Sequence, residues 1–104
     1  MATVSATSLS AGVVNLASGS FTSDNTATTV NLGFTPRWVK VVNSTDVIVW
    51  EKIEGMAAAN SIKTVTNGTT TVDTGSAILI VGGSFSLSKT AVGSSKAISW
   101  VAQG

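Results

Sequence analysis

The sequence predicts an all-β fold: a single small β-sandwich or jelly-roll-like domain of about seven to nine short antiparallel strands. Three observations lead to this prediction. The 14 Val, 6 Ile and 15 Thr residues make up about a third of the chain, and β-branched residues favour strands. Short alternating segments recur between turn signals, at a spacing of about 8–12 residues. A chain of 104 residues has room for one domain.

The N-terminal quarter is predicted to differ from the rest. Residues 1–25 should form an extended N-terminal arm and a first short strand, followed by a β-sandwich domain over residues 26–104. Residues 12–16, which include Val13, Val14 and Leu16, can form that strand. Gly19-Ser20 and the polar residues at 22–25 (Thr, Ser, Asp and Asn) are typical of turns.

The clearest hairpin lies in the middle of the chain. Residues 28–32 alternate as a strand, and residues 33–36 break it with a glycine and the single proline, which cannot donate to a strand ladder. Residues 37–42 and 47–53 alternate again on either side of a polar turn at residues 43–46. This arrangement predicts two long antiparallel strands joined by a four-residue connection.

The second half of the chain carries one weak helix signal and two hairpin signals. Residues 54–60 have a helix-forming composition but are long enough for only one or two turns. Asn67-Gly68 and Gly82-Gly83 are typical of two-residue hairpin turns of type I′. The remaining strands are predicted over residues 62–66, 69–73, 77–81, 84–88 and 96–101.

Composition excludes several classes of function. Six Lys/Arg face five Asp/Glu, so the net charge of +1 provides no electrostatic footprint for nucleic acid. The absence of His, Cys and Tyr removes disulfides, Cys/His zinc sites and His-based catalytic triads. The longest apolar stretch is far too short to cross a membrane. We therefore expect no enzyme, no cofactor, no metal and no small-molecule substrate.

Two patterns associated with catalysis elsewhere have simpler explanations here. A Ser-x-x-Lys sequence at residues 86–89 would need a helix to bring its Ser and Lys together, but it falls on a predicted strand. The acidic residues lie in or beside turns or at the end of a strand, rather than in a pair suited to acid–base catalysis. They are Asp24, Asp46, Glu51, Glu54 and Asp73.

Three tryptophans leave two interpretations open. Trp38, Trp50 and Trp100 can fill the core or anchor a subunit contact, which is the more common use of indoles in a small sandwich. They can also form a platform on which sugars stack. Arg37 precedes Trp38, and an interface salt bridge is preferred for it over a ligand contact.

The run VNLGFTPRWVKVVN at residues 30–43 resembles a pattern found in small structural proteins of tailed bacteriophages. In those proteins a Gly-Phe-x-Pro-[Arg/Lys]-x-Val turn leads into a core strand. The continuation through residues 45–57 is similar to proteins of the phage head and tail regions. The resemblance extends over about residues 28–102, and related strand–turn patterns also occur in lectin-like modules of tail fibres.

The resemblance implies a virion component that works by packing. The expected function is that of a capsid decoration (cement) protein, which sits as a homotrimer on the capsid surface and locks capsomers together. Its partners would be the major capsid protein and sister subunits, after synthesis in the host cytoplasm. Residues 2–20 resemble the arms by which cement proteins reach capsid strands by β-augmentation. The expected interface residues are Val4, Leu9, Val13, Arg37, Trp38 and Trp50.

A second interpretation belongs to a different class of function. A tail or tail-fibre module that binds a carbohydrate or receptor would use Trp38, Trp50 or Trp100 as its stacking platform. Burial distinguishes the two, because indoles enclosed by the protein's own core cannot serve as a platform.

Overall fold

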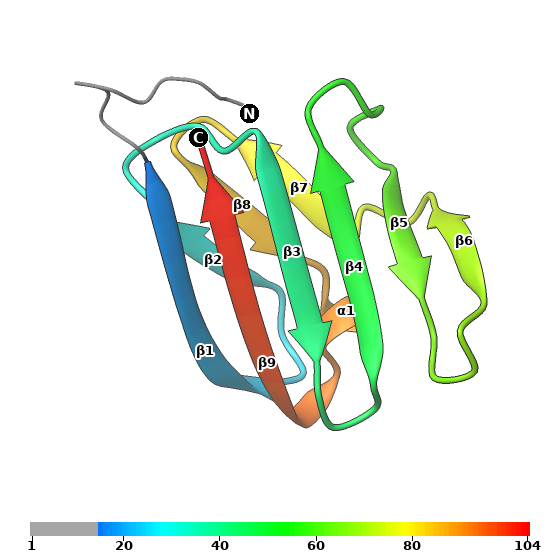
Figure 1. Cartoon of the computed structure of the whole chain (residues 1–104). Coiled ribbons are helices and arrows are strands. Elements are labelled where there is room, and N and C mark those ends of the chain that lie inside the picture. The colour runs from blue at the N-terminus through cyan, green and yellow to red at the C-terminus, as the bar shows by residue number, and fades with distance from the viewer. Residues whose placement is uncertain (1–14) are drawn as a thin grey trace.

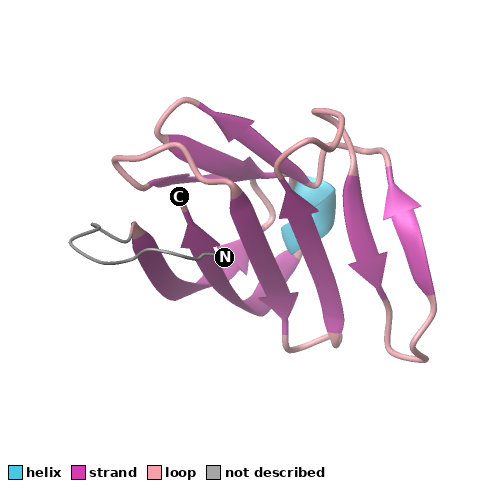
Figure 2. Ribbon diagram, turned by 45° about the horizontal axis from the view of Figure 1, so that its top comes forward, coloured by secondary structure: helices cyan, strands magenta, loops and turns pink. Residues whose placement is uncertain are grey.

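A computed structural model describes residues 15–104, and it confirms the all-β prediction. In these residues nine antiparallel strands form two sheets, and one short helix connects two of the strands (Figures 1 and 2). The elements are β1 (Leu16–Asp24), β2 (Thr28–Asn31), β3 (Trp38–Asn43), β4 (Ile48–Ile53), β5 (Ser61–Thr64), β6 (Thr70–Asp73), β7 (Ile78–Val81), β8 (Ser84–Leu87), α1 (Lys89–Val92) and β9 (Ser94–Gln103).

The two sheets differ in size. One has six strands in the order β1-β9-β3-β4-β5-β6, and the other has three in the order β2-β8-β7. The smaller sheet lies behind the β1–β4 part of the larger one, so the β5–β6 hairpin extends beyond it (Figure 1). The three residues Thr70 to Val72 of β6 are accordingly exposed.

The core lies between the facing sides of the two sheets. Val39 and Val41 of β3 and Ile98 of β9 are at most 1% exposed. Phe85 of β8 packs against them, and its ring meets that of Trp100 edge to face with 5.4 Å between centroids. This geometry is favourable for two aromatic rings and fixes how the small sheet sits on the large one.

The β3–β4 hairpin is confirmed, with its turn shifted by one residue. Asn43 ends β3, and its buried side-chain Oδ1 accepts hydrogen bonds from the backbone N–H groups of Thr45 and Asp46. An asparagine that binds the backbone in this way sets up the turn that follows it. The predicted break at residues 33–36 also occurs, with Gly33 at a φ of 84° ahead of the core strand β3.

The prediction for residues 16–25 is partly wrong. Leu16–Asp24 form one nine-residue strand that pairs with β9, so Gly19 and Ser20 lie in a strand instead of a turn. The indole of Trp100 lies directly over Gly19, where a Cβ would come within 2.8 Å of the ring. The glycine is therefore explained by a close approach across the sheet, not by a chain reversal.

Three local predictions differ in detail. Residues 54–60 form turns instead of a helix, and the short helix is α1, whose first turn is capped by the Ser88 hydroxyl. The Asn67-Gly68 hairpin exists, but five residues connect β5 and β6. Gly82-Gly83 is a two-residue connection as predicted. Of this pair only Gly82 has a positive φ, which suits a type II′ turn, not type I′.

We expect Gly19→Val to destabilise the sandwich by about 1–3 kcal/mol, because its side chain would displace the Trp100 indole. Chemical denaturation followed by tryptophan fluorescence measures this loss. Ser20→Val is the matched control, because Ser20 points to the exposed side of the same strand. Equal stabilities for the two variants would contradict the close contact.

Candidate functional site

The side of the six-stranded sheet that faces away from the small sheet is the candidate site, and we call it the outer face. Its side chains alternate along each strand with the buried ones. On β3, Trp38, Lys40 and Val42 alternate with the core residues Val39 and Val41.

Apolar side chains are spread across the outer face. Strand register places Trp38 opposite Ile53, Val42 opposite Val49, and Ile62 opposite Val72. Three of the apolar residues on the sheet are more than half exposed, with Leu16 at 62%, Ile53 at 51% and Val72 at 56%. The apolar members of the outer face are Leu16, Trp38, Val42, Val49, Ile53, Ile62, Val72 and Val101.

The centre of the outer face carries one pair of opposite charges. Lys40 and Glu51 are cross-strand partners on β3 and β4. The Trp38 indole N–H donates a hydrogen bond of 2.6 Å to the Glu51 carboxylate, which holds that side chain in place. The centre therefore combines zero net charge with a partly satisfied carboxylate. Such a surface can be covered without transferring net charge out of water.

Arg37 and Glu54 lie at the rim of the outer face. Their side chains approach to 3.5 Å and remain 70% and 66% exposed. An exposed ion pair of this kind contributes little to stability. Backbone bonds hold the two residues more firmly, since Arg37 N–H donates to Gln103 and the Arg37 carbonyl accepts from Glu54.

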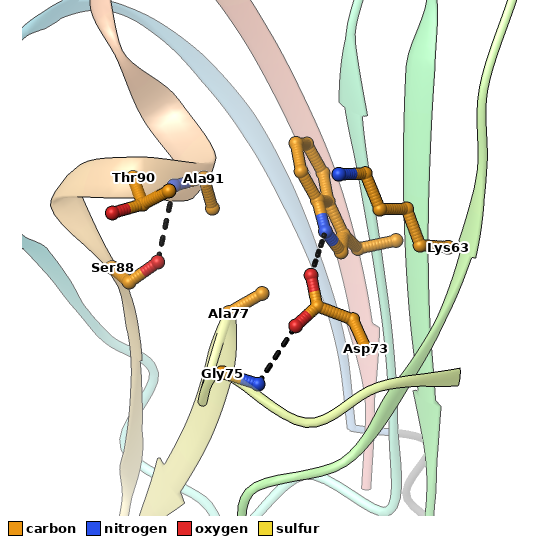
Figure 3. A pocket seen from close by; sticks show the side chains of 8 residues that line it. Lys63, Asp73, Gly75, Ala77, Ser88, Thr90 and Ala91 are labelled. Atoms are coloured by element: carbon orange, nitrogen blue, oxygen red, sulfur yellow. Dashed lines mark hydrogen bonds between the residues drawn. The ribbon is translucent and has the colours of Figure 1, made fainter. Parts of the chain in front are cut away.

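Trp50 requires a correction, because it lies on the opposite side of the sheet from Trp38. It is 3% exposed and packs in the chain's own core, so the expected interface role is replaced by a structural one. The Trp50 indole N–H donates to Asp73 Oδ2 at 3.2 Å, and the Gly75 N–H donates to Asp73 Oδ1 at 2.8 Å (Figure 3). Lys63 Nζ lies 5.7 Å from the centroid of the Trp50 ring.

These groups border a small pocket of about 160 Å³ between the β5–β6 hairpin and α1. Figure 3 shows Lys63 and Asp73 on one side and Ser88, Thr90 and Ala91 on the other. Both Asp73 oxygens already accept hydrogen bonds, so the carboxylate serves mainly to tie β6 to β4.

The structure does not bring the three tryptophans together. Trp38 lies on the outer face, whereas Trp50 is in the core and Trp100 is held between Gly19 and Phe85. Val4, Leu9 and Val13 of the expected interface lie outside the described residues.

Lys52 was not identified from the sequence. It is 5% exposed, and its ammonium donates to the carbonyls of Ala57, Ala58 and Asn60 at 2.8, 3.0 and 2.7 Å. Burial lowers the pKa of this ammonium from its ordinary value of 10.5. Its burial could have been inferred from its position two residues after Trp50, because alternate residues of a strand lie on the same side of the sheet.

A second pocket of about 280 Å³ opens beside Lys52. Pro36, Ile53, Met56 and Ile80 contribute apolar surface to it. Its lining combines Ile53 of the outer face with Lys52 and with Ile80 of the small sheet.

Comparison with known proteins adds no assignment: no family model, no curated protein and no solved structure matches this chain. None of the helices in residues 15–104 has the length and apolar character required to cross a membrane. Within the same residues, no group of three or more acidic side chains is placed to hold a metal ion.

We expect Asp73→Ala to lower the free energy of unfolding by about 1–3 kcal/mol, because the buried Trp50 N–H would lose its acceptor. Denaturant unfolding followed by tryptophan fluorescence measures the loss. Asp24→Ala is the control, since the hydrogen bond that Asp24 accepts from the Thr26 hydroxyl is exposed. A control loss as large as that of Asp73→Ala would contradict the proposed anchoring role.

We expect Lys52→Met to cost about 2 kcal/mol or more, because three carbonyl acceptors lose an ammonium donor. Lys40→Met on the outer face is the control, with a much smaller expected effect.

The Lys52 contribution also depends on pH. Between the lowered folded-state pKa and 10.5, the unfolded chain binds more protons at Lys52 than the folded chain does. Stability of the wild-type protein relative to Lys52→Met should therefore rise with pH through this interval and fall as the pH is lowered. A difference that is constant with pH, or that falls as pH rises, would contradict this prediction.

Proposed function

We propose that this protein is a structural component of a phage virion, specifically a capsid decoration protein that stabilises the head by binding across capsomers. The observation that carries the proposal is the outer face, which presents exposed apolar side chains around the neutral Lys40–Glu51 pair. The resemblance of residues 30–43 to phage structural proteins supplies the class of partner, the major capsid protein.

The size of the outer face is adequate for a protein partner. Six strands at a spacing of about 4.8 Å span about 29 Å, and six residues of strand span about 20 Å, which gives about 600 Å² before side-chain relief is included. A standard interface buries about 800 Å² on each partner. The rim at Arg37 and the pocket beside Ile53 can provide the remaining contact area of about 200 Å².

The charge pattern favours a protein surface over nucleic acid or a charged ligand. Covering the outer face would bury one lysine and one glutamate that already lie opposite each other, so no net charge would be transferred from water. Surfaces with exposed apolar residues and few charges are typical of protein contact sites.

The alternative, a carbohydrate- or receptor-binding module of a tail fibre, has weaker support. A stacking platform needs an accessible indole face, and Trp50 is buried while Trp100 is packed against Phe85. Trp38 is the one tryptophan on the outer face, and its indole N–H is already bonded to Glu51.

We expect Val42→Glu to weaken binding to phage heads that lack this protein by at least about tenfold, because it places an unpaired charge inside the interface. Titration of the purified protein onto such heads measures the effect. Thr29→Glu is the matched control, because it adds the same charge to the exposed side of β2, on the other sheet. Both variants should show wild-type circular dichroism.

Three outcomes would overturn the proposal: no binding of the wild-type protein to heads, full binding by Val42→Glu, or equal losses for the two variants. Quenching of tryptophan fluorescence by a soluble glycan, abolished by Trp38→Ala, would favour the fibre module instead.

A further inference from the structure

One sheet edge differs from the others in length and chemistry. The edge strands of the two sheets are β1, β6, β2 and β7, and the last three have four residues each. β1 has nine residues, with no charge and no proline from Leu16 to Ser23. Natural proteins usually protect exposed edges with short strands, lysines or prolines. β1 uses none of these over eight residues.

The backbone groups that point away from the sheet at this edge can be identified. The Gly104 N–H donates to the Asn15 carbonyl at 2.9 Å, so Asn15 faces β9. Antiparallel ladders alternate, and the N–H and C=O groups of Ser18, Ser20 and Thr22 therefore point outward. Within residues 15–104, no other backbone segment is hydrogen-bonded to this edge.

We propose that β1 is the surface through which two copies of this chain associate, by antiparallel pairing of β1 with β1 of a second copy about a two-fold axis at Ser20. The outward groups of Ser18, Ser20 and Thr22 would form about six intermolecular backbone hydrogen bonds. The two six-stranded sheets become one continuous sheet of twelve strands.

This register is self-complementary, which is why the second copy is the favoured occupant. Ser20 would lie opposite itself and Ser18 opposite Thr22, so no like charges meet. On the inner side, Gly19 would lie opposite Phe21 of the partner subunit. Gly19 adds no side chain to this contact, because the Trp100 indole of its own chain already fills the space over it.

The pairing also has a consequence for the proposed function. It leaves the outer face uncovered and joins two such faces side by side, so a dimer would offer twice the surface to a capsid. The symmetry is two-fold, and it differs from the homotrimer that the resemblance to cement proteins implies.

Light scattering after size exclusion, over a range of concentrations of the full-length protein, tests the inference. We expect a monomer–dimer equilibrium that Ser20→Pro shifts toward the monomer by at least about tenfold, because proline removes one outward N–H without touching the β1–β9 ladder. Ser20→Lys should do the same by placing two like charges opposite each other.

Ser99→Lys is the control, because Ser99 is the neighbour of Ser20 on β9 and its side chain is exposed on the same face. It should dimerise as the wild type does. Circular dichroism and thermal unfolding check that each variant is folded.

A single cysteine gives an independent readout, since the natural chain has none. Ser20→Cys should form a disulfide-linked dimer under mild oxidation much faster than Ser99→Cys. A wild-type monomer at all concentrations, a trimer, or a dimer that Ser20→Pro does not weaken would overturn the inference. Each of these results leaves the head-binding test of the proposed function unaffected, because that test uses Val42→Glu and Thr29→Glu, which lie on strands other than β1.

Discussion

The division of nine strands into sheets of six and three determines most of what this protein presents to its surroundings. A three-stranded sheet can cover one side of four strands, and Phe85, Leu87 and Ile78 use that cover to form the core. The other side of the large sheet receives no cover within residues 15–104, and the small sheet does not reach the β5–β6 hairpin. Exposed apolar residues on the outer face follow from this imbalance, without any special motif.

Polar contacts replace apolar packing where the small sheet ends. Trp50 and Asp73 join β4 to β6 at one border of the core, and Lys52 gathers three carbonyls at another. Each contact satisfies groups that would otherwise be buried without partners. The edges of the sandwich are thus held by directed bonds, whereas its centre is held by aromatic and aliphatic contact.

Local chemistry predicted the parts of the fold in which neighbouring residues decide the structure. The β3–β4 hairpin and the Gly82-Gly83 turn were predicted because alternation and turn residues are readable over a few positions. β1 was missed because a Ser- and Gly-rich strand resembles a loop until β9 and Trp100 are placed beside it. The helix predicted over residues 54–60 was wrong because Lys52 draws their carbonyls out of helical bonding.

The candidate site was harder to predict than the fold, because residues of the same type differ in whether they are buried or exposed. Trp38 and Trp50 both lie on long strands of the same hairpin, and only the position of the small sheet decides which indole is covered. The outer face was not predicted as a unit either, since its members come from six strands distributed from Leu16 to Val101.

The Lys52 contacts also limit how the chain can vary in length. An ammonium at a fixed position on β4 reaches the carbonyls of Ala57, Ala58 and Asn60 only if the intervening loop keeps its present number of residues. The connection between β5 and β6 has no such anchor to a buried charge and lies at the exposed end of the hairpin. Insertions should therefore accumulate between β5 and β6, and the segment after β4 should keep a constant length wherever a lysine occupies the equivalent of position 52.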